Sequence, residues 1–489
     1  MPEQGPDQGS VSYTRADGEY FEKRGLRRHA RVLHLWALGV GGVISGDFFG
    51  WNFGLVAGGS VGMFVALAIM TVMYAGLCFS IAEMSPALPH TGGAYSFGRT
   101  AMGPWGGYIT GLAENMEYIL TPAVIVVGIG GYLGAIFGTP KSAEPLWWLA
   151  SYAVFVALNV YGVELSFRVS VVITLIALAV LVVFWIAAIP RMDFARYALD
   201  VVPRAGNSKW FPGGTAGVLA QLPFALWFYL AIEQLPLAAE ESHDPKRDMP
   251  RGLIYGLGTL VLVSFFTLGA SVSIAPGATK LATSNEPLLL DFQTLFATTG
   301  AKVLGLIACT GLIASFHTII FAYGRQIFSL SRAGYFPQWL SETHPRHKTP
   351  VRALIAGSAL GFAAAYAIYL SGEKGTVGAM LLNMAVFGAV VAYILQMASF
   401  IVLRWKLPSI ERPYRSPLGV TGAVIAALIA AVTLVMLFFA PEYNRGVLGA
   451  AAWFLAGVAY FAFYARRRLI LSPEEEFAMS HITETHKKT

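Results

Sequence analysis

The chain of 489 residues is 56% hydrophobic and only 13% charged, and its formal net charge is +6. Soluble globular proteins carry about 25% charged residues, so this composition excludes an ordinary soluble protein and indicates an integral membrane protein. In that setting, Lys and Arg placed beside membrane spans explain the positive charge better than nucleic-acid binding does. Cys78 and Cys309 lie in apolar runs, so we expect no disulfide framework, no metal site and no cofactor.

Windows of about 20 apolar residues predict an all-α integral membrane protein with twelve transmembrane helices. The residues before the first window are polar and basic, and they lack the apolar core of a cleavable signal peptide. The predicted spans lie near residues 32–57, 62–86, 104–137, 146–163, 168–190, 216–238, 252–275, 301–331, 352–371, 377–403, 418–440 and 446–465.

Basic residues at alternate ends of these spans predict their orientation. With the N-terminus inside, most of the 34 Lys and Arg residues lie in inner segments. We therefore expect a protein of the inner or plasma membrane with both termini in the cytoplasm. The expected parts are a cytoplasmic N-terminal segment over 1–31, a ten-helix inverted-repeat transport core over 32–404, helices 11 and 12 over 405–468, and a cytoplasmic tail over 469–489. Within the tail, we expect Glu474–Glu476, Lys487 and Lys488 to be solvated.

The first span is interrupted between Gly42 and Gly50, where glycines surround Asp47. A charge at the centre of a membrane helix costs about 2.5–3.5 kcal/mol on insertion scales. Non-helical backbone is tolerated at that depth only where it lines a cavity within the protein. Broken helices form midplane binding sites in many secondary transporters, so the break predicts a binding site, and Asp47 predicts a positively charged ligand.

The sixth span is interrupted by Pro223, Glu233 and Pro236. If the first and sixth spans each begin a five-helix half, the two breaks would lie on either side of one central site. The alternative is a pair of unrelated Pro and Gly kinks, which are common in membrane helices.

Two further acids, Glu114 and Glu117, lie three residues apart in the third span, directly before Tyr118. Intramembrane acids almost always face the protein interior, so at least one of the two should reach the cavity. Either acid could instead form a structural ion pair with Arg325 or His317, the cationic residues expected at comparable depth. Such an excess of acids favours a cation as the ligand.

Four segments resemble the amino acid–polyamine–organocation superfamily, and the resemblance covers about residues 30–470. They are Ser45–Phe49, Glu83–Tyr95, Ala239–Pro250 and Arg325–Pro337. The resemblance implies a transporter rather than an enzyme, with a LeuT-like fold of twelve transmembrane helices in a 5+5 inverted repeat and broken helices 1 and 6. The amino-acid sequences of Val43–Gly54 and Gly111–Asn115 are similar to those of the ethanolamine permease branch.

The resemblance also implies roles for individual residues. Glu117 and Tyr118 match substrate-lining positions, Glu114 matches the position of an aromatic gate, and Trp227 matches an aromatic that closes over substrate. The candidates combine these matches with residues selected for their side-chain chemistry. The substrate-binding candidates are Ser45, Gly46, Asp47, Phe48, Glu114, Glu117, Tyr118, Trp227, Phe228, Tyr229 and Ala231. The gating or coupling candidates are Glu233 and His317.

Asp47 departs from the amino-acid pattern, because it stands where the family has the second glycine of a Gly-Ser-Gly element. In amino-acid members this element offers backbone N–H groups to the substrate carboxylate. A carboxylate side chain would repel that group and attract an ammonium group. Two alternatives stay open, in which Asp47 caps the second half-helix or binds a coupling ion.

Other candidates each have a structural alternative. Trp227, Phe228 and Tyr229 could contribute cation–π contacts or simply pack in the core. His317 could carry a proton or be a hydrogen-bonded core histidine. Ala177 stands where some proton-coupled relatives have a lysine, so that mechanism does not transfer.

The expected function is import of a small cationic amine, above all ethanolamine, by alternating access. The alternative is transport or exchange of an amino acid or of another amine, such as choline or putrescine. The expected partners are the amine and the bilayer, without nucleic acid. Proton coupling, sodium coupling and a homodimer stay open.

Overall fold

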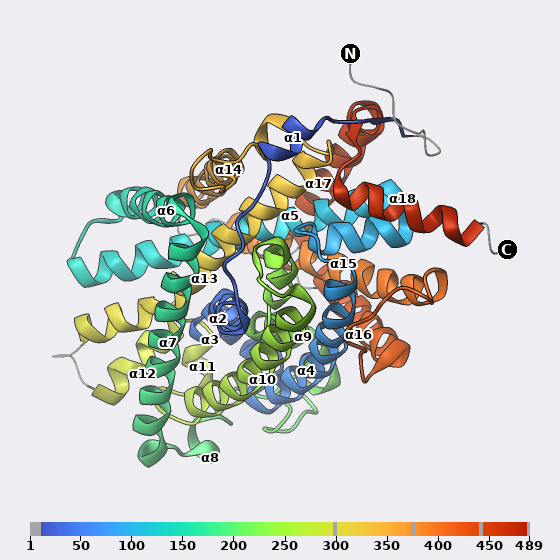
Figure 1. Cartoon of the computed structure of the whole chain (residues 1–489). Helices are drawn as coiled ribbons and strands as arrows, with labels where there is room; N and C mark the ends of the chain where they lie inside the picture. Colours follow the sequence, from blue (N-terminus) through green and yellow to red (C-terminus); the bar gives the residue numbers. More distant parts are fainter. Residues whose placement is uncertain (1–10, 297–300, 373–376, 440–443, 487–489) are drawn as a thin grey trace.

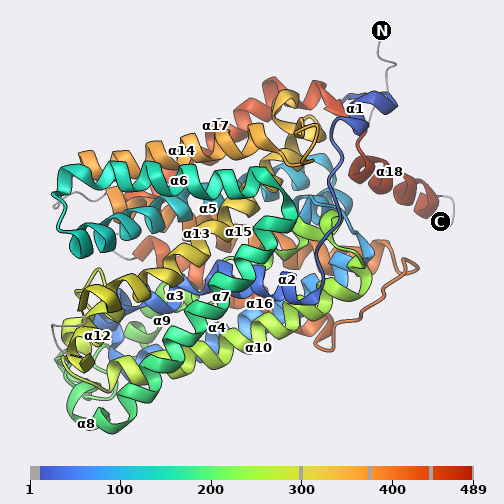
Figure 2. The same ribbon diagram turned by 60° about the vertical axis from the view of Figure 1, so that its left-hand side comes forward.

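The computed structural model describes residues 11–296, 301–372, 377–439 and 444–486, and these are almost entirely helical. The long helices run between two ends of the molecule (Figures 1 and 2). Both ends of the described chain lie at one of them, which we call the termini face. The short helices α8 (Phe194–Tyr197) and α12 (Pro287–Phe296) lie at the other, which we call the opposite face, and the short helix α11 (Ala278–Leu281) precedes α12 in the chain.

All twelve predicted spans are helical, and the first and sixth are divided. The undivided ones are α4 (Leu55–Ala87), α5 (Gly93–Phe137), α6 (Glu144–Tyr161), α7 (Val163–Ala188), α10 (Pro245–Val272), α13 (Ala301–Arg332), α14 (Val351–Leu370), α15 (Val377–Lys406), α16 (Gly419–Phe439) and α17 (Asn444–Phe463). The short elements outside the spans are β1 (Tyr13–Thr14), α1 (Gly18–Glu22), η2 (Lys141–Ala143), η3 (Ile189–Arg191), η7 (Gln338–Ser341), η8 (Ala465–Arg467), β2 (Leu469–Ile470) and α18 (Pro473–His486).

Length and hydropathy identify ten of the described helical segments as able to cross a membrane, and Val32–Phe48 is a shorter apolar helix. The predicted fourth span corresponds to α6, which has 18 residues and is not one of the ten. The structure is therefore that of a helical protein with many membrane spans, and twelve crossings stay a prediction.

Both predicted breaks are present. In the first span, α2 (Val32–Val43) is followed by α3 (Ser45–Phe48), an extended Phe49, and Gly50 with φ +97° before η1 (Trp51–Gly54). In the sixth span, α9 (Gly214–Ala225) gives way to η4 (Leu226–Phe228) and then η5 (Ile232–Glu241). Glycine tolerates the positive φ at Gly50 without steric penalty, which lets the chain change direction there.

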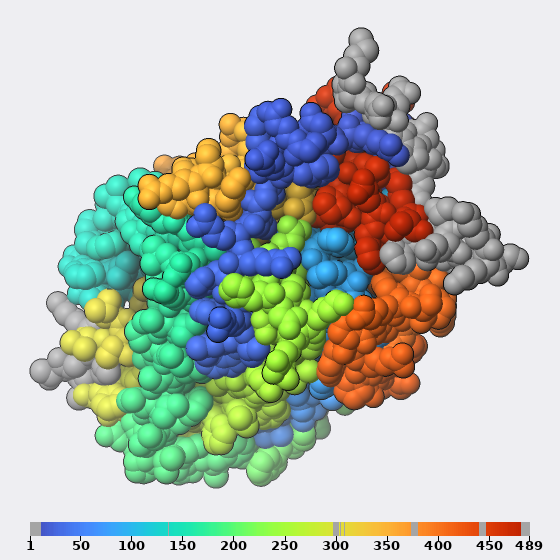
Figure 3. All heavy atoms as spheres, viewed as in Figure 1, coloured from blue at the N-terminus to red at the C-terminus, as the bar shows by residue number. Residues whose placement is uncertain are grey.

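The two ends of the chain are bound to each other and to the bundle at the termini face. Strand β1 pairs in parallel with β2, so that Tyr13 lies opposite Leu469. Figure 3 shows the N-terminal segment in blue beside the C-terminal segment in red. The segments before the first span and after the last one are therefore packed together rather than separate.

The expectation that Glu474–Glu476 is a solvated run is wrong for two of its three residues. Glu474 and Glu475 are buried, and only Glu476 is exposed. Glu474 forms an ion pair with Arg332, and Glu475 forms one with Arg99. The reason is that the guanidinium groups of Arg99 and Arg332 are themselves buried in the bundle and attract acids from α18. Lys487 and Lys488 lie outside the described residues.

Three tyrosine hydroxyl groups surround the Glu475 carboxylate. Tyr13 donates to it at 2.7 Å, Tyr95 at 2.8 Å and Tyr335 at 3.0 Å. Burial and the neighbouring Glu475 charge raise the pKa of Tyr13 above its ordinary value, so its hydroxyl group keeps the proton that it donates. Glu475 thus connects α18 with β1, with α5 and with the segment that follows α13.

We predict that Glu475→Ala lowers the free energy of unfolding by about 3–5 kcal/mol, because removal of one partner of a buried ion pair leaves the other charge exposed to an apolar interior. The measurement is thermal unfolding of the detergent-solubilised protein, followed by tryptophan fluorescence. Glu476→Ala is the control, since that side chain is exposed on the same helix. Equal melting temperatures for the two variants would contradict the structural role of Glu475.

Candidate substrate site

Gly46 and Trp227 bring the two breaks into direct contact. A Cβ atom placed on Gly46 would lie 1.9 Å from the Trp227 carbonyl oxygen and 2.7 Å from the carbonyl carbon. No side chain fits at these distances, so the position requires glycine. The Trp227 ring lies over the first break, with its centroid 6.0 Å from that of Phe49, and it also packs against Gly50.

The residues on either side of Gly46 attach the first break to α13. The Ser45 backbone N–H donates to the Ser315 hydroxyl at 2.9 Å, and that hydroxyl donates to the Gly41 carbonyl at 2.9 Å. The Phe48 ring fills the space left by the missing side chain of Gly311. Ser45 and Phe48 therefore position the break through α13, in addition to any contact with a ligand.

Asp47 is 1% exposed and projects from α3 into the protein. The Thr267 hydroxyl of α10 is its neighbour, and Tyr229 lies on another side. Neither Asp47 oxygen accepts a hydrogen bond of normal geometry, and no Lys or Arg pairs with it, in the part of the chain that the structure describes. Because its side chain binds no backbone N–H, the alternative that Asp47 is a helix cap is not supported.

Glu117 and Glu233 form a second acidic group, and their carboxyl groups face each other. Tyr118 donates to Glu233 at 3.1 Å and Tyr393 donates to it at 2.9 Å. Glu114 lies near the pair and accepts a hydrogen bond from Gln326 at 2.7 Å. All three glutamates are buried, and none forms an ion pair with a described residue.

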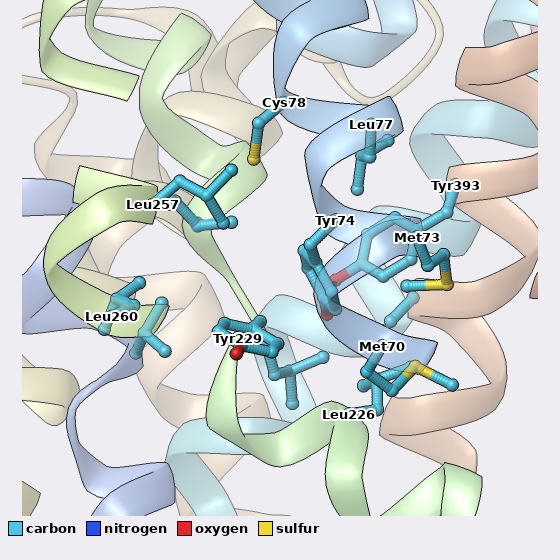
Figure 4. Close-up of a cluster of buried hydrophobic side chains, with 14 of the residues drawn as sticks. Met70, Met73, Tyr74, Leu77, Cys78, Leu226, Tyr229, Leu257, Leu260 and Tyr393 are labelled. Atoms are coloured by element: carbon cyan, nitrogen blue, oxygen red, sulfur yellow. Dashed lines mark hydrogen bonds between the residues drawn. The ribbon is translucent and has the colours of Figure 1, made fainter. Parts of the chain in front are cut away.

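Asp47 and Glu117, both substrate-binding candidates, lie in different groups of side chains. A row of tyrosines separates them. Tyr229 lies beside Tyr74, with ring centroids 5.2 Å apart, and Tyr74 donates to the Tyr393 hydroxyl at 3.2 Å (Figure 4). Tyr393 in turn donates to Glu233, so the tyrosines connect the two acidic groups across the core.

Phe228 and Ala231, two further substrate-binding candidates, make contacts within the protein. The Phe228 ring stacks on Trp51 at 5.5 Å, which turns it toward η1 and away from Asp47. Ala231 is buried and has φ +79°, a left-handed conformation that is uncommon for a residue with a side chain. It directly precedes η5, and its carbonyl group accepts a hydrogen bond from the Gln234 N–H at 3.3 Å.

The basic candidates lie elsewhere. His317 is buried between α6 and α7, where Asn159 and the Ser166 hydroxyl each lie 3.3 Å from a ring nitrogen. Arg325 forms an ion pair with Glu241 at 2.8 Å. Neither is paired with Glu114 or Glu117, so these contacts fit a core histidine and an ion pair near the termini face.

Sequence reasoning missed several polar residues of the site. They are Tyr74, Ser264, Thr267, Gln326 and Tyr393. The signal for two of them was present, because Ser264, Thr267 and Ser271 recur at helical spacing within an apolar span. The other three are single polar residues, and their roles depend on which residues the fold places opposite them.

Comparison with known proteins identifies the family. The family model described as amino acid permease matches residues 34–472. The chain belongs to the amino acid permease family. It is therefore a multi-pass membrane transporter, not an enzyme.

Three individual relatives support this assignment. An uncharacterized transporter of Rhizobium meliloti is 27% identical, over 92% of this chain and 95% of its own length. A branched-chain amino acid permease of Bacillus subtilis is 24% identical, over 91% and 94%. A chloroplastic cationic amino acid transporter of Arabidopsis thaliana is 25% identical, over 89% and 74%. The two substrates named for these relatives, branched-chain and cationic amino acids, differ, so the family does not determine the substrate of this permease.

We predict that Gly46→Ala abolishes transport, because the added methyl group would overlap the Trp227 carbonyl and force the two breaks apart. Uptake into proteoliposomes and the melting temperature are the measurements. Gly258→Ala in α10 is the control, since a Cβ there meets nothing within 4 Å. Normal uptake by the Gly46 variant would show that the breaks are not in close contact.

Proposed function

We propose that this permease carries a small cationic amine, with ethanolamine as the first candidate. The observation that supports this most is Asp47, a buried carboxylate at the contact of the two breaks that accepts no hydrogen bond of normal geometry and has no cationic partner among the described residues. A buried charge without a partner is strongly unfavourable. An ammonium group would supply both the opposite charge and the missing donors.

The surroundings of Asp47 suit an ammonium group. Ethanolamine is cationic at neutral pH because its amine titrates far above 7, as that of lysine does. Trp227 and Tyr229 lie on two sides of the break and could add cation–π contacts of about 0.5–2 kcal/mol each. We propose that Trp227 closes over the bound amine. The substrate hydroxyl group could bond to Thr267 or to backbone groups of the break.

Glu117 and Glu233 are proposed as the gating or coupling pair. Two facing carboxyl groups repel when both are ionised, so the pair favours a cation or a proton between them. Hydrogen bonds connect this pair through Tyr393 to Tyr74, and the Tyr74 ring packs beside Tyr229, which lies near Asp47. Binding at Asp47 and charge at the pair would then influence each other.

An amino acid is the alternative substrate, and the names of the Bacillus subtilis and Arabidopsis thaliana relatives favour it. Its carboxylate would need the N–H groups of the first break, where Asp47 would repel it at short range. We therefore place amines ahead of amino acids. We also propose that the termini face is cytoplasmic, because the inner segments carry most Lys and Arg residues, and that the protein lies in the inner or plasma membrane.

Substrate competition tests this proposal. We predict that ethanolamine competes strongly for transport and that serine, its carboxylated analogue, competes weakly. Asp47→Asn should reduce ethanolamine affinity by more than about 100-fold, because loss of one partner of a buried charge pair costs roughly 3–5 kcal/mol. The measurement is uptake of labelled ethanolamine into proteoliposomes with a panel of amines and amino acids as competitors.

Asp193→Asn is the matched control. Asp193 is exposed at the opposite face and caps α8 by accepting from the Arg196 N–H at 3.1 Å, a bond that Asn can also accept. It should leave affinity unchanged. Tight binding of serine, or normal affinity of the Asp47 variant, would contradict the assignment of Asp47 to the ammonium group.

The driving force can be tested separately. A cationic substrate is drawn inward by the membrane potential with about 2.3 kcal/mol per charge per 100 mV. We predict that an inside-negative potassium diffusion potential alone accelerates ethanolamine uptake into substrate-free proteoliposomes. Uptake that ignores the potential and requires internal substrate or a sodium gradient would show that another gradient drives transport.

A further inference from the structure

A row of three hydroxyl groups runs along α10 on the side that faces the bundle. Ser264, Thr267 and Ser271 are buried, with exposed fractions of 0%, 0% and 2%. Residues three, four and seven positions apart lie on one face of a helix. Ser264 lies 3.0 Å from the Tyr229 hydroxyl, and Thr267 is the neighbour of Asp47. The row therefore starts at the substrate site and continues to Ser271.

Ser271 faces a second unpartnered acid, Asp291, at the opposite face. Asp291 lies on α12 and is fully buried. Neither of its oxygens accepts a hydrogen bond of normal geometry, and no ion pair involves it, within the residues that the structure describes. Tyr132 of α5 lies near it, and its hydroxyl group likewise has no hydrogen-bond partner of normal geometry there.

Apolar packing holds Asp291 in this position. Phe292, the next residue of α12, packs on Phe184 of α7 with ring centroids 5.7 Å apart. Phe292 also belongs to the apolar cluster that contains Phe48 of the first break and Ala270 of α10. Helix α12 is thus part of the bundle, and its acid is directed inward beside α10.

The two unpartnered acids lie beside successive hydroxyl groups of α10, Asp47 beside Thr267 and Asp291 beside Ser271. Thr267 and Ser271 are four residues apart, which is about 6 Å along a helix. Asp291 lies at the end of the row near the opposite face, and Asp47 lies further inside. A cation that left Asp291 would have hydroxyl oxygens of α10 beside it until it reached Asp47.

We propose that Asp291 and Ser271 form an outer subsite for a monovalent cation, which holds the ammonium group of the amine before it reaches Asp47. The inference rests on the proposed function, because it takes the same amine as its ligand. It assigns α12 a function, since the helix carries the acid that first replaces the water around the entering charge. Na⁺ shares this chemistry, and the test separates the two cations.

Asp291→Asn tests the subsite in proteoliposomes. Hydrogen bonds to charged groups are strong enough that their loss should raise KM for ethanolamine uptake about tenfold or more. Equilibrium binding of ethanolamine to the detergent-solubilised protein should stay within about twofold of wild type, because Asp47 is intact. Asp200→Asn is the matched control at the same face, since Asn can still accept the Thr279 N–H that Asp200 accepts at 3.0 Å.

Further variants keep the test decisive. Asp291→Glu keeps the charge and should preserve uptake, and Ser271→Ala should raise KM by a smaller factor. If Asp291→Asn lowers the melting temperature too far for an uptake assay, Ser271→Ala decides in its place. An unchanged KM in the folded variant would overturn the proposal, as would a rise in KM that occurs only in sodium medium, which would assign the subsite to Na⁺. Failure of the wild-type protein to bind ethanolamine would instead overturn the proposed function.

Discussion

The contact between Gly46 and the Trp227 carbonyl group determines the geometry of the centre of this permease. Two helices are irregular at the same place, and each leaves backbone groups without helical partners, which an apolar environment does not tolerate. The protein satisfies several of them with side chains from α13 and from the broken spans themselves. Ser315 accepts from the Ser45 N–H, Asn52 accepts from the Gly50 N–H at 3.1 Å, and Gln234 donates to the Leu38 carbonyl at 3.4 Å. These contacts determine where Asp47 and Trp227 lie.

The pairing of acids divides the molecule into two regions. At the termini face, buried acids have Arg partners, as in the pairs Glu241–Arg325, Glu83–Arg404 and Glu475–Arg99. In the interior, Asp47, Glu117 and Asp291 have no ion pair within the described residues, although they are equally buried. The contrast suggests that the interior acids without an Arg partner have a function other than stabilising the fold. A mobile cation that comes and goes is the simplest partner for them.

The sequence identified the features that are rare in membrane helices. A glycine-rich break with an acid, a second break between two prolines, and acids in the third span are each expensive, and each proved to be a buried feature of the core. The sequence patterns did not predict which side chains of distant helices lie opposite each other. The rotation of α5 about its axis directs Glu117 toward Glu233 and away from Asp47. The pattern of residues within α5 alone does not indicate which residue of another helix Glu117 will face. The charges of α18 were misjudged because an acidic run at a chain end usually faces water, whereas here Arg99 and Arg332 bind it.

The two faces are closed by different kinds of contact, and this difference bears on alternating access. At the termini face, Arg332 connects Glu240 and Glu474 through buried ion pairs. Near the opposite face, the elements are joined by neutral hydrogen bonds, such as those from Asn52 to the carbonyl groups of Leu281 and Ser284 at 2.7 and 2.8 Å, and by bonds with one charged partner, such as that from the Thr279 N–H to Asp200 at 3.0 Å. Separation of buried ion pairs requires rehydration of several charges, whereas neutral hydrogen bonds exchange readily for bonds to water. The opposite face should therefore open at a smaller cost in free energy, and it is the face at which α12 holds Asp291.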